Sequence, residues 1–301
     1  MLRKRGVLKS PTSLMLTHEI RLFSLFGCAA LVLAAGCSSE SDGPTGEPAT
    51  APILAESPQP SPEPTAPPAA TTTPAAAPVD DPGPAPAGCG PITKDSDGFF
   101  TRTTSTGSYV GFVPASYAGK PTTLVVGLHG CGDDAMNFAT WAVNPWDTRG
   151  KQAHIGISIG GKDGSCWDTN KDSDKVLAAI DDVSKCFYVH KQKVVLAGYS
   201  SGGMLAYKLG LAQSSRFAGI IIENSGLGSA QPSAAKWKIN VAHIAHKGDN
   251  NFPLSSVHGD WAKLEAAGIP LQKSEVDGTH DGDSEDWNTF LLPKIAGWKA
   301  P

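Results

Sequence analysis

Lysine and arginine are sparse in this chain, and beyond about its first ten residues they form no cluster. With a formal net charge of −4 over 301 residues, the chain offers no basic stripe for a nucleic-acid backbone. Nucleic acid is therefore not expected as a partner. The sequence also shows no cofactor motif and no constellation of metal ligands. It contains no Cys-x-x-Cys, which argues against a zinc or redox motif of that type.

Apolar residues from 22 to 35 form a run shorter than the roughly 20 residues that a membrane-spanning helix needs. Basic residues precede this run, and it ends in Leu33-Ala34-Ala35-Gly36-Cys37. The pattern resembles a bacterial lipobox, in which the Cys is lipidated and becomes the first residue after cleavage. We expect residues 1–36 to be a lipoprotein signal peptide. An ordinary secretory signal with a Cys at 37 by chance is the alternative, and a start at Met15 stays open.

Both alternatives predict an exported protein. We expect it to be lipid-anchored to the bacterial cell envelope through Cys37, with release outside the cell as the other outcome. Residues 37–87 follow, rich in Pro, Ala, Thr and Ser and without Lys or Arg. Such a segment cannot bury enough apolar surface to offset its ordering entropy, so we predict a disordered tether.

Residues 88–301 have the composition and length of one globular domain. Continuous apolar strands alternate with amphipathic helices, which predicts a mostly parallel sheet covered by helices on both faces. The predicted strands are 109–113, 123–128, 154–159, 193–197, 217–222, 241–245 and 271–276. The predicted helices are 174–185, 201–212, 256–267 and a closing helix at 286–298.

The pentapeptide Gly198-Tyr199-Ser200-Ser201-Gly202 fits G-x-S-x-G, the nucleophile elbow of the α/β-hydrolase fold. Its context supports the motif, because an apolar β-branched strand precedes it and a helical segment follows. Glycines on both sides relieve the crowding of a sharp strand-to-helix turn. The sequence thus predicts an α/β-hydrolase fold with Ser200 as nucleophile, and Ser201 is the competing serine.

A serine hydroxyl needs a base, and in this fold the chain order is Ser, then acid, then His. His280 lies in a loop between the last predicted strand and the closing helix, where this fold places its base. His243 falls inside a strand and is expected in the core, and His258 lies on a helix. His246 is expected to line the acid loop.

Asp249 follows the strand at 241–245 and is the predicted acid that orients His280. The alternatives are Asp281, Asp283 and, more weakly, Asp277. For the oxyanion hole we expect two backbone amides, one from Ser201 and one from Cys131 in the loop after the strand at 123–128. His129, in that same loop, is expected to organise it rather than act as base.

Four cysteines, 89, 131, 166 and 186, remain once Cys28 leaves with the signal peptide and Cys37 carries the lipid. An even number in an exported chain suggests two disulfides, and the spacing leaves all three pairings open.

Several of these segments together resemble the secreted feruloyl esterase and polyhydroxybutyrate depolymerase-like family, the carbohydrate esterase family one and its relatives. The resemblance spans about residues 87–298, through Ala87-Gly88-Cys89-Gly90, Leu128-His129-Gly130-Cys131, Ser165-Cys166-Trp167, Cys186 and the elbow. It implies the pairs Cys89–Cys186 and Cys131–Cys166, the latter bracing the oxyanion loop. The chain departs from the family at the acid, because the spacing from His246 to Asp249 is one residue shorter.

These observations predict an exported serine esterase without a cofactor or a metal. Its substrate would be a small ester or an ester-bearing polymer with a feruloyl, acetyl or hydroxyalkanoate group. Trp167 and Tyr199 are the predicted substrate-binding residues. The same triad would serve a peptidase or an acyltransferase. A non-catalytic glycan-binding lipoprotein, with Trp141, Trp146 and Trp167 as an aromatic platform, is a further alternative.

Overall fold

A computed structural model describes residues 79–161 and 165–301. The predicted signal peptide, the lipid-bearing Cys37 and the tether as far as residue 78 lie outside the described residues. Within the part that is described, no helix is long and apolar enough to cross a membrane.

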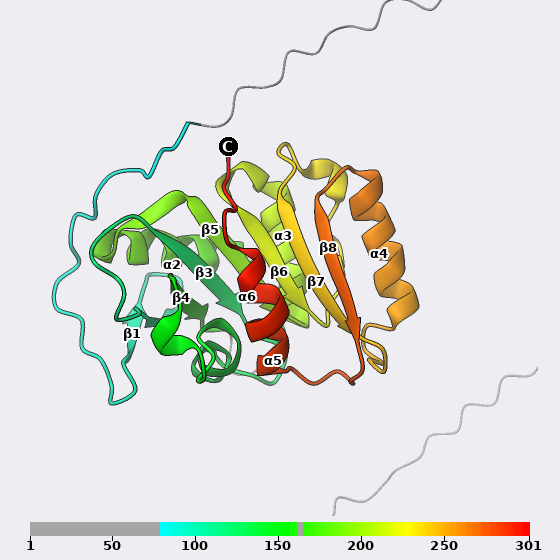
Figure 1. The fold of residues 1–301 in the computed structure, drawn as a ribbon, viewed down its shortest axis with the longest axis horizontal. Helices are drawn as coiled ribbons and strands as arrows, with labels where there is room; N and C mark the ends of the chain where they lie inside the picture. The colour runs from blue at the N-terminus through cyan, green and yellow to red at the C-terminus, as the bar shows by residue number, and fades with distance from the viewer. Residues whose placement is uncertain (1–78, 162–164) are drawn as a thin grey trace, which may run out of the picture. The chain divides into compact units, whose positions relative to one another are not determined.

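Eight strands form one sheet in the order β1-β2-β4-β3-β5-β6-β7-β8 (Figure 1). Strands β3 to β8 run parallel to one another, and β1 and β2 join antiparallel at the β4 edge. Parallel strands end at the same edge of a sheet, so the loops that follow them meet there. The strands are β1 (Phe99–Thr103), β2 (Ser108–Phe112), β3 (Thr122–Leu128), β4 (His154–Ile159), β5 (Val189–Tyr199), β6 (Gly219–Glu223), β7 (Asn240–His246) and β8 (Leu271–Val276).

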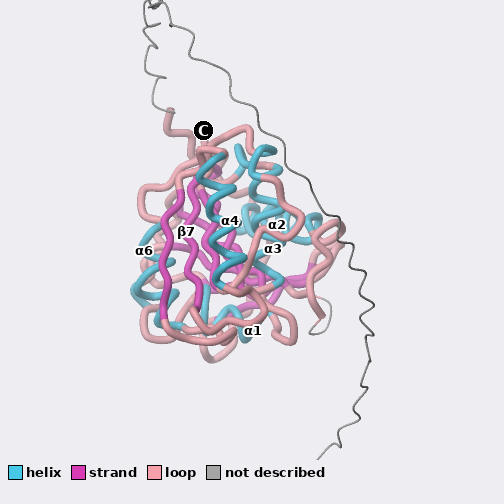
Figure 2. The backbone as a smooth tube through the Cα atoms, turned by 90° about the vertical axis from the view of Figure 1, so that its right-hand side faces the viewer, coloured by secondary structure: helices cyan, strands magenta, loops and turns pink. Residues whose placement is uncertain are grey.

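Helices cover both faces of the sheet, as the continuous apolar strands predict (Figure 2). Alternate residues of β3 divide between two cores: Leu124 and Val126 face one, and Val125 faces the other. The first core receives α2 (Ser173–Cys186), α3 (Ser201–Ala212) and α4 (Leu254–Ala266). The second receives α1 (Ala135–Phe138), the π-helical turn Ala139–Val143 and the C-terminal helical segment.

The predicted closing helix at 286–298 is wrong as one continuous element. The structure has α5 (Ser284–Asp286), a π-helical turn Trp287–Leu291 and α6 (Leu292–Lys294) in its place. Pro293 has no backbone N–H, and a proline is accommodated best in the first turn of a helix, where it lies here. The wider π turn places Trp287 and Leu291 in the second core, where both are fully buried.

Residues 79–87, which the sequence assigned to the tether, run along the folded part and bond to it. The Asp81 N–H donates to Gln192 Oε1 at 2.8 Å, and the Tyr188 hydroxyl donates to Gly83 O at 3.0 Å. Asp80 forms an ion pair with Lys299, and its Oδ1 lies 3.2 Å from His190 Nε2. The folded part therefore includes residues 79–87, ahead of the expected boundary at 88.

Candidate active site

Ser200 occupies the turn between β5 and α3, at the edge of the sheet where the parallel strands end. Its backbone has φ 53° and ψ −122°, a left-handed conformation that a non-glycine residue rarely adopts. The flanking glycines are required: a Cβ on Gly198 would lie 2.6 Å from Gly202 O, and one on Gly202 would lie 1.9 Å from Leu128 O. The local sequence therefore builds the strained elbow that the G-x-S-x-G pattern predicts.

His280 lies between Ser200 and Asp249, within hydrogen-bond distance of both. Its Nε2 is 2.9 Å from Ser200 Oγ, and its Nδ1 is 2.8 Å from Asp249 Oδ2. Asp249 follows β7 and His280 follows β8, so three separate strand ends supply the three side chains. The other Asp249 oxygen accepts the N–H groups of Asn251 and Phe252 at 2.7 and 3.0 Å, which fixes the carboxylate.

Two aromatic rings hold the plane of the His280 imidazole. Tyr199 stacks on it with centroids 5.4 Å apart at 26°, and Phe252 does so at 5.6 Å and 30°. The Tyr199 hydroxyl also donates to the His280 carbonyl. Tyr199, predicted to bind substrate, thus packs directly against the predicted base, and a contact with substrate stays a prediction.

The rival acids named from the sequence have other partners. Asp281 accepts from the Thr279 hydroxyl at 2.6 Å, and Asp277 pairs with Lys247 at 3.0 Å. Asp283 caps α5 by accepting the Glu285 N–H at 2.8 Å. In this structure, Asp249 is the carboxylate that His280 contacts.

The loop after β3 lies beside Ser200. A Cβ on Gly130 would lie 2.6 Å from the Tyr199 ring and 3.3 Å from Ser200 Cβ, so only glycine fits there. In the described part of the chain, neither the Cys131 nor the Ser201 amide donates to a protein acceptor. Two such free N–H groups next to a serine are what an oxyanion hole requires, and that role stays a prediction.

His129 organises this loop, as the sequence predicts. It is 1% exposed, its Nδ1 is 2.8 Å from Gly130 O, and its Nε2 accepts the Gly161 N–H at 3.1 Å. Trp167 donates from Nε1 to the His129 carbonyl at 2.8 Å. Trp167 is only 6% exposed, and the hydrogen bond that it makes is with this loop. Substrate binding by Trp167 stays a prediction.

The three tryptophans of the suggested glycan platform share no exposed face. Trp146 is 66% exposed and lies over Arg149, whereas Trp167 is buried. Trp141 packs edge-on against Tyr199 and Trp287. The structure thus gives the aromatic platform no support.

Two disulfides join the cysteines in the pairs that the family resemblance implies. Cys89–Cys186 ties the start of the domain to the end of α2, and Cys131–Cys166 ties the loop beside Ser200 to the segment before α2. The second bridge therefore restrains the loop that carries the predicted oxyanion amide.

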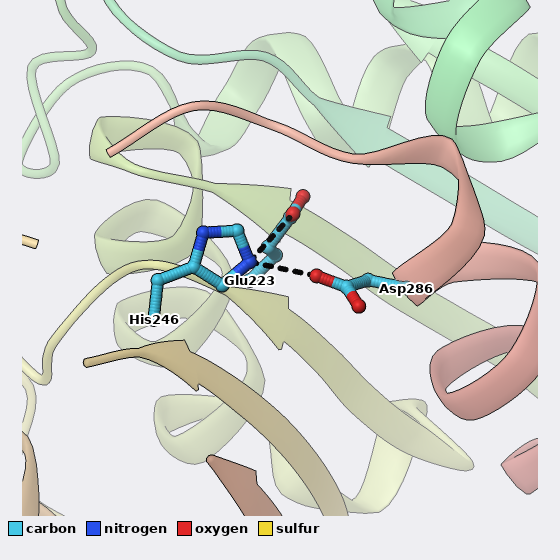
Figure 3. Close-up of side chains that lie close together, drawn as sticks. All are labelled: Glu223, His246 and Asp286. Atoms are coloured by element: carbon cyan, nitrogen blue, oxygen red, sulfur yellow. Dashed lines mark hydrogen bonds and ion pairs between the residues drawn. The ribbon is translucent and has the colours of Figure 1, made fainter. Parts of the chain in front are cut away.

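Glu223, His246 and Asp286 form a second polar cluster (Figure 3), and His246 contacts the carbonyl of Thr279, the residue before His280. Glu223 ends β6, His246 ends β7 and Asp286 ends α5. The Nε2 atom of His246 is 2.7 Å from Asp286 Oδ2 and 3.7 Å from Glu223 Oε1. Neither Glu223 nor Asp286 was predicted from the sequence as a site residue. A carboxylate directly after the apolar run Ile220–Ile222 is the signal that could have indicated Glu223.

Burial and charge shift the pKa values in this cluster. Burial raises the pKa of the fully buried Glu223 to about 8. The hydrogen bonds from Trp287 and Asp283 act in the opposite direction and lower this pKa. The hydrogen bond to Asp286 raises the pKa of His246 above its ordinary value. By contrast, burial lowers the pKa of the core residue His243 to about 3.

The same cluster offers the donor types of a divalent-cation site, with ligand atoms within 4.8 Å of one another. These atoms already have protein partners. Glu223 accepts the Asp283 N–H at 2.9 Å and the Trp287 Nε1–H at 2.6 Å, and His246 bonds to Asp286. We therefore interpret it as a hydrogen-bonded cluster.

A cavity of about 410 Å³ lies away from Ser200, at the opposite edge of the sheet. Thr123, His154 and Lys193 line it near the starts of β3, β4 and β5. Burial lowers the pKa of His154 to about 4, which keeps that ring neutral at pH 7. This cavity therefore shares no residue with the site around Ser200.

The sheet order, the antiparallel β2 and the elbow after β5 define an α/β-hydrolase fold. Comparison with solved structures supports this fold assignment. The sequence identities are low, so the similarity shows the fold alone. Fluorophosphonate-binding serine hydrolase F of Staphylococcus aureus is 15% identical at a TM-score of 0.51, over 66% of this chain and 96% of that one. The ferulic acid esterase Fae1A of Anaeromyces mucronatus is 12% identical at 0.51, over 64% and 88%.

The solved structures that share this fold also include a peptidase. Dipeptidyl peptidase 4 of Porphyromonas gingivalis is 13% identical at a TM-score of 0.51, over 69% of this chain and 35% of that one. No protein-family model and no curated protein matches the sequence. The fold is thereby established, and the reaction has to be argued from the site.

Proposed function

We propose that this protein is a serine carboxylic-ester hydrolase with Ser200, His280 and Asp249 as its catalytic triad. One observation carries the proposal: the continuous hydrogen-bonded path from Ser200 Oγ through His280 to Asp249, at 2.9 and 2.8 Å. Nucleophile, base and orienting acid in such contact are the arrangement that activates a serine. The chain order Ser, Asp, His agrees with the fold.

The geometry supports a two-step reaction. Ser200 Oγ attacks the ester carbonyl carbon as its proton passes to His280 Nε2, while Asp249 holds the resulting imidazolium through Nδ1. The Cys131 and Ser201 amides would donate to the oxyanion of the tetrahedral intermediate. His280 returns the proton to the departing alcohol, which leaves an acyl group on Ser200. Water, deprotonated by His280, then releases the acid and regenerates the serine.

The proposed substrate is a feruloyl, acetyl or hydroxyalkanoate ester, small or carried on a polymer. The family resemblance supports this choice, as does the fold shared with a ferulic acid esterase. We further propose that the protein works outside the cytoplasm, anchored through a lipid on Cys37. Two disulfides in the described domain agree with an oxidising compartment.

A peptidase is the second candidate, and the fold shared with dipeptidyl peptidase 4 favours testing it. An acyltransferase would use the same acyl-enzyme with another acceptor in place of water. The triad geometry is common to these reactions, so the leaving group that the site accepts decides among them.

Hydrolysis by the purified protein, measured against matched substrates, tests the proposal. The panel contains p-nitrophenyl acetate, methyl ferulate, a hydroxybutyrate oligomer and dipeptide p-nitroanilides. We expect hydrolysis of at least one ester, with kcat at least about 10³-fold lower in Ser200→Ala. Ser116→Ala, a serine substitution away from the site, is the control. Cleavage of amides without esters would replace the esterase with the peptidase.

A further inference from the structure

The loop that carries His280 is held by three side chains from the ends of two strands, β6 and β7. His246 Nδ1 lies 2.7 Å from the carbonyl oxygen of Thr279, the residue before His280. The Asn224 amide donates to the carbonyl of Asp281, the residue after it, at 3.1 Å. The N–H of Asp283 donates to Glu223 Oε1 at 2.9 Å. The position of His280 therefore depends on residues outside the triad.

Each ring nitrogen of His246 lies 2.7 Å from an oxygen, which indicates N–H donors at both positions. The Thr279 carbonyl can only accept, so Nδ1 must carry a proton to bond to it. An ionised Asp286 also accepts only, so Nε2 must carry one as well. A neutral imidazole has a single N–H and can make one of these bonds but not both. The Asn224 amide nitrogen also lies 3.0 Å from Nδ1, but the contact of Nδ1 with the Thr279 carbonyl is shorter, at 2.7 Å, and that amide has an acceptor in Asp281 O. These distances favour an imidazolium.

Two carboxyl groups face this ring, Asp286 from α5 and Glu223 from the end of β6 (Figure 3). The other groups that contact it are uncharged: Asn224, Thr279, Gly278 and the neighbouring strand residue Val276. The ring itself is 5% exposed on its side chain, so water cannot replace its partners. The hydrogen bond to the Asp286 carboxylate raises the pKa of His246 and outweighs burial, which acts in the opposite direction.

We propose that Glu223, His246 and Asp286 form a positioning cluster that holds the His280 loop in its working geometry while His246 is an imidazolium. Loss of the His246 proton then breaks one of its two bonds and loosens the loop. Hydrolysis would therefore have an alkaline limit that is set outside the triad. This inference rests on the proposed function, because it concerns the base of that reaction.

The experiment measures kcat and KM for p-nitrophenyl acetate from pH 5 to 9.5 with the full chain. Asp286→Asn removes one negative charge while keeping the shape of the side chain. His246→Asn keeps a donor near the Nδ1 position but cannot titrate. His258→Asn is the matched control, because His258 also pairs with a carboxylate, Glu275 at 2.7 Å, but contacts neither the cluster nor the His280 loop.

In the wild type we expect kcat to fall on the alkaline side. In Asp286→Asn the midpoint of that fall should move down by about 1 pH unit or more, because an opposite charge at this distance shifts a pKa by that much. The kcat at pH 8 should drop about tenfold or more with KM within about twofold, since misplacing a catalytic group slows the chemical step. In His246→Asn the alkaline fall should disappear, and His258→Asn should follow the wild type.

An unchanged alkaline midpoint in Asp286→Asn overturns the inference, as does a wild-type kcat that stays level to pH 9.5. If His246→Asn does not fold, the Asp286→Asn midpoint decides. Long-range ¹H–¹⁵N NMR of the histidines in Ser200→Ala provides a readout without catalysis. His246 protonated on both nitrogens at pH 7 supports the cluster, and a neutral ring there rejects it. Absence of ester hydrolysis in the wild type, with His246 still an imidazolium, would reject the proposed function alone.

Discussion

The triad acid was the catalytic role with the most alternatives in the sequence, and the structure gives Asp249 a distinct environment. Its side chain is 1% exposed, and its two oxygens are divided between His280 and two backbone amides. A carboxylate so placed can stabilise an imidazolium without becoming protonated itself.

Asp249→Asn should lower kcat by about 10³- to 10⁴-fold, because an amide in this position favours the wrong tautomer of His280. Its KM should change little. The control is Asp277→Asn, since Asp277 is exposed and pairs with Lys247. Steady-state kinetics with an ester that the wild type hydrolyses would measure kcat and KM for both variants. A comparable loss in Asp281→Asn, with Asp249→Asn near wild type, would transfer the acid role to Asp281.

Glu223 links the pH dependence of stability to a single buried group. Its pKa is about 8 in the folded protein, against an ordinary value of 4.5. A raised acid pKa means that the folded state binds the extra proton between these values, so stability is greatest below about pH 4.5 and is lost as pH rises through about 8. Glu223→Gln, which resembles the protonated acid, removes that loss.

The Tm of Glu223→Gln minus that of the wild type should therefore increase from pH 5 to pH 8.5 in thermal unfolding. The free energy at stake is on the order of a few kcal/mol, since each pKa unit is worth about 1.4 kcal/mol. Exposed Glu265→Gln serves as the matched substitution and should give a constant difference. A constant difference for Glu223→Gln as well would show that this carboxyl is ionised throughout.

At the scale of elements, the loop after β3 is restrained by several independent contacts. His129, Trp167 and the Cys131–Cys166 bridge all act on it, and Gly130 brings it against Ser200. The Cys89–Cys186 bridge closes a longer loop, with a separation of 97 residues against 35, and lies at the edge of the domain.

Removing the two bridges should therefore have different effects. Cys131→Ser with Cys166→Ser should lower kcat by about tenfold or more, because the predicted oxyanion amide loses its brace. Cys89→Ser with Cys186→Ser should mainly lower the free energy of unfolding, by about 5 kcal/mol as expected for a loop of that length, with kcat retained. Kinetics and denaturant unfolding on both pairs would measure this. Equal effects on kcat would contradict the assignment of the loop.

The elements that the sequence predicted correctly are those whose pattern is local. Helix α3 and strand β4 match their predicted ranges, because a largely apolar run of residues marks each in the sequence. The closing helix failed because a π turn buries Trp287 against Phe138, a residue 149 positions earlier in the chain. Glu223 was missed for a similar reason. Its partners Asp283 and Trp287 lie about 60 residues away, and a single sequence carries no signal for such a contact.

At the scale of the whole molecule, the arrangement of parallel strands explains why the site forms. The ends of β3, β5, β6, β7 and β8 bring the 129–131 loop, Ser200, Glu223, Asp249 and His280 to one edge (Figure 1). The chain-order rule predicted the edge and the triad, whereas the supporting cluster required the three-dimensional contacts.

The folded part begins earlier than composition suggested, which gives a test of its boundary. Deleting residues 79–87 from a protein that starts at 79 removes the bonds to Gln192, Tyr188 and Lys299. A loss of about 2 kcal/mol would lower Tm by roughly 4–8 °C in a domain of this size. Thermal unfolding of proteins that start at 79 and at 88 compares them directly. Equal Tm values would return 79–87 to the tether.

Labelling with a fluorophosphonate probe tests the central claim most directly, because the probe reacts only with an activated serine. The wild-type protein and Ser200→Ala are incubated with the probe, and the labelled peptide is identified by mass spectrometry. The triad account predicts one adduct, on Ser200, in the wild type and none in Ser200→Ala. No adduct on the folded wild type, or an adduct on Ser201, would contradict it.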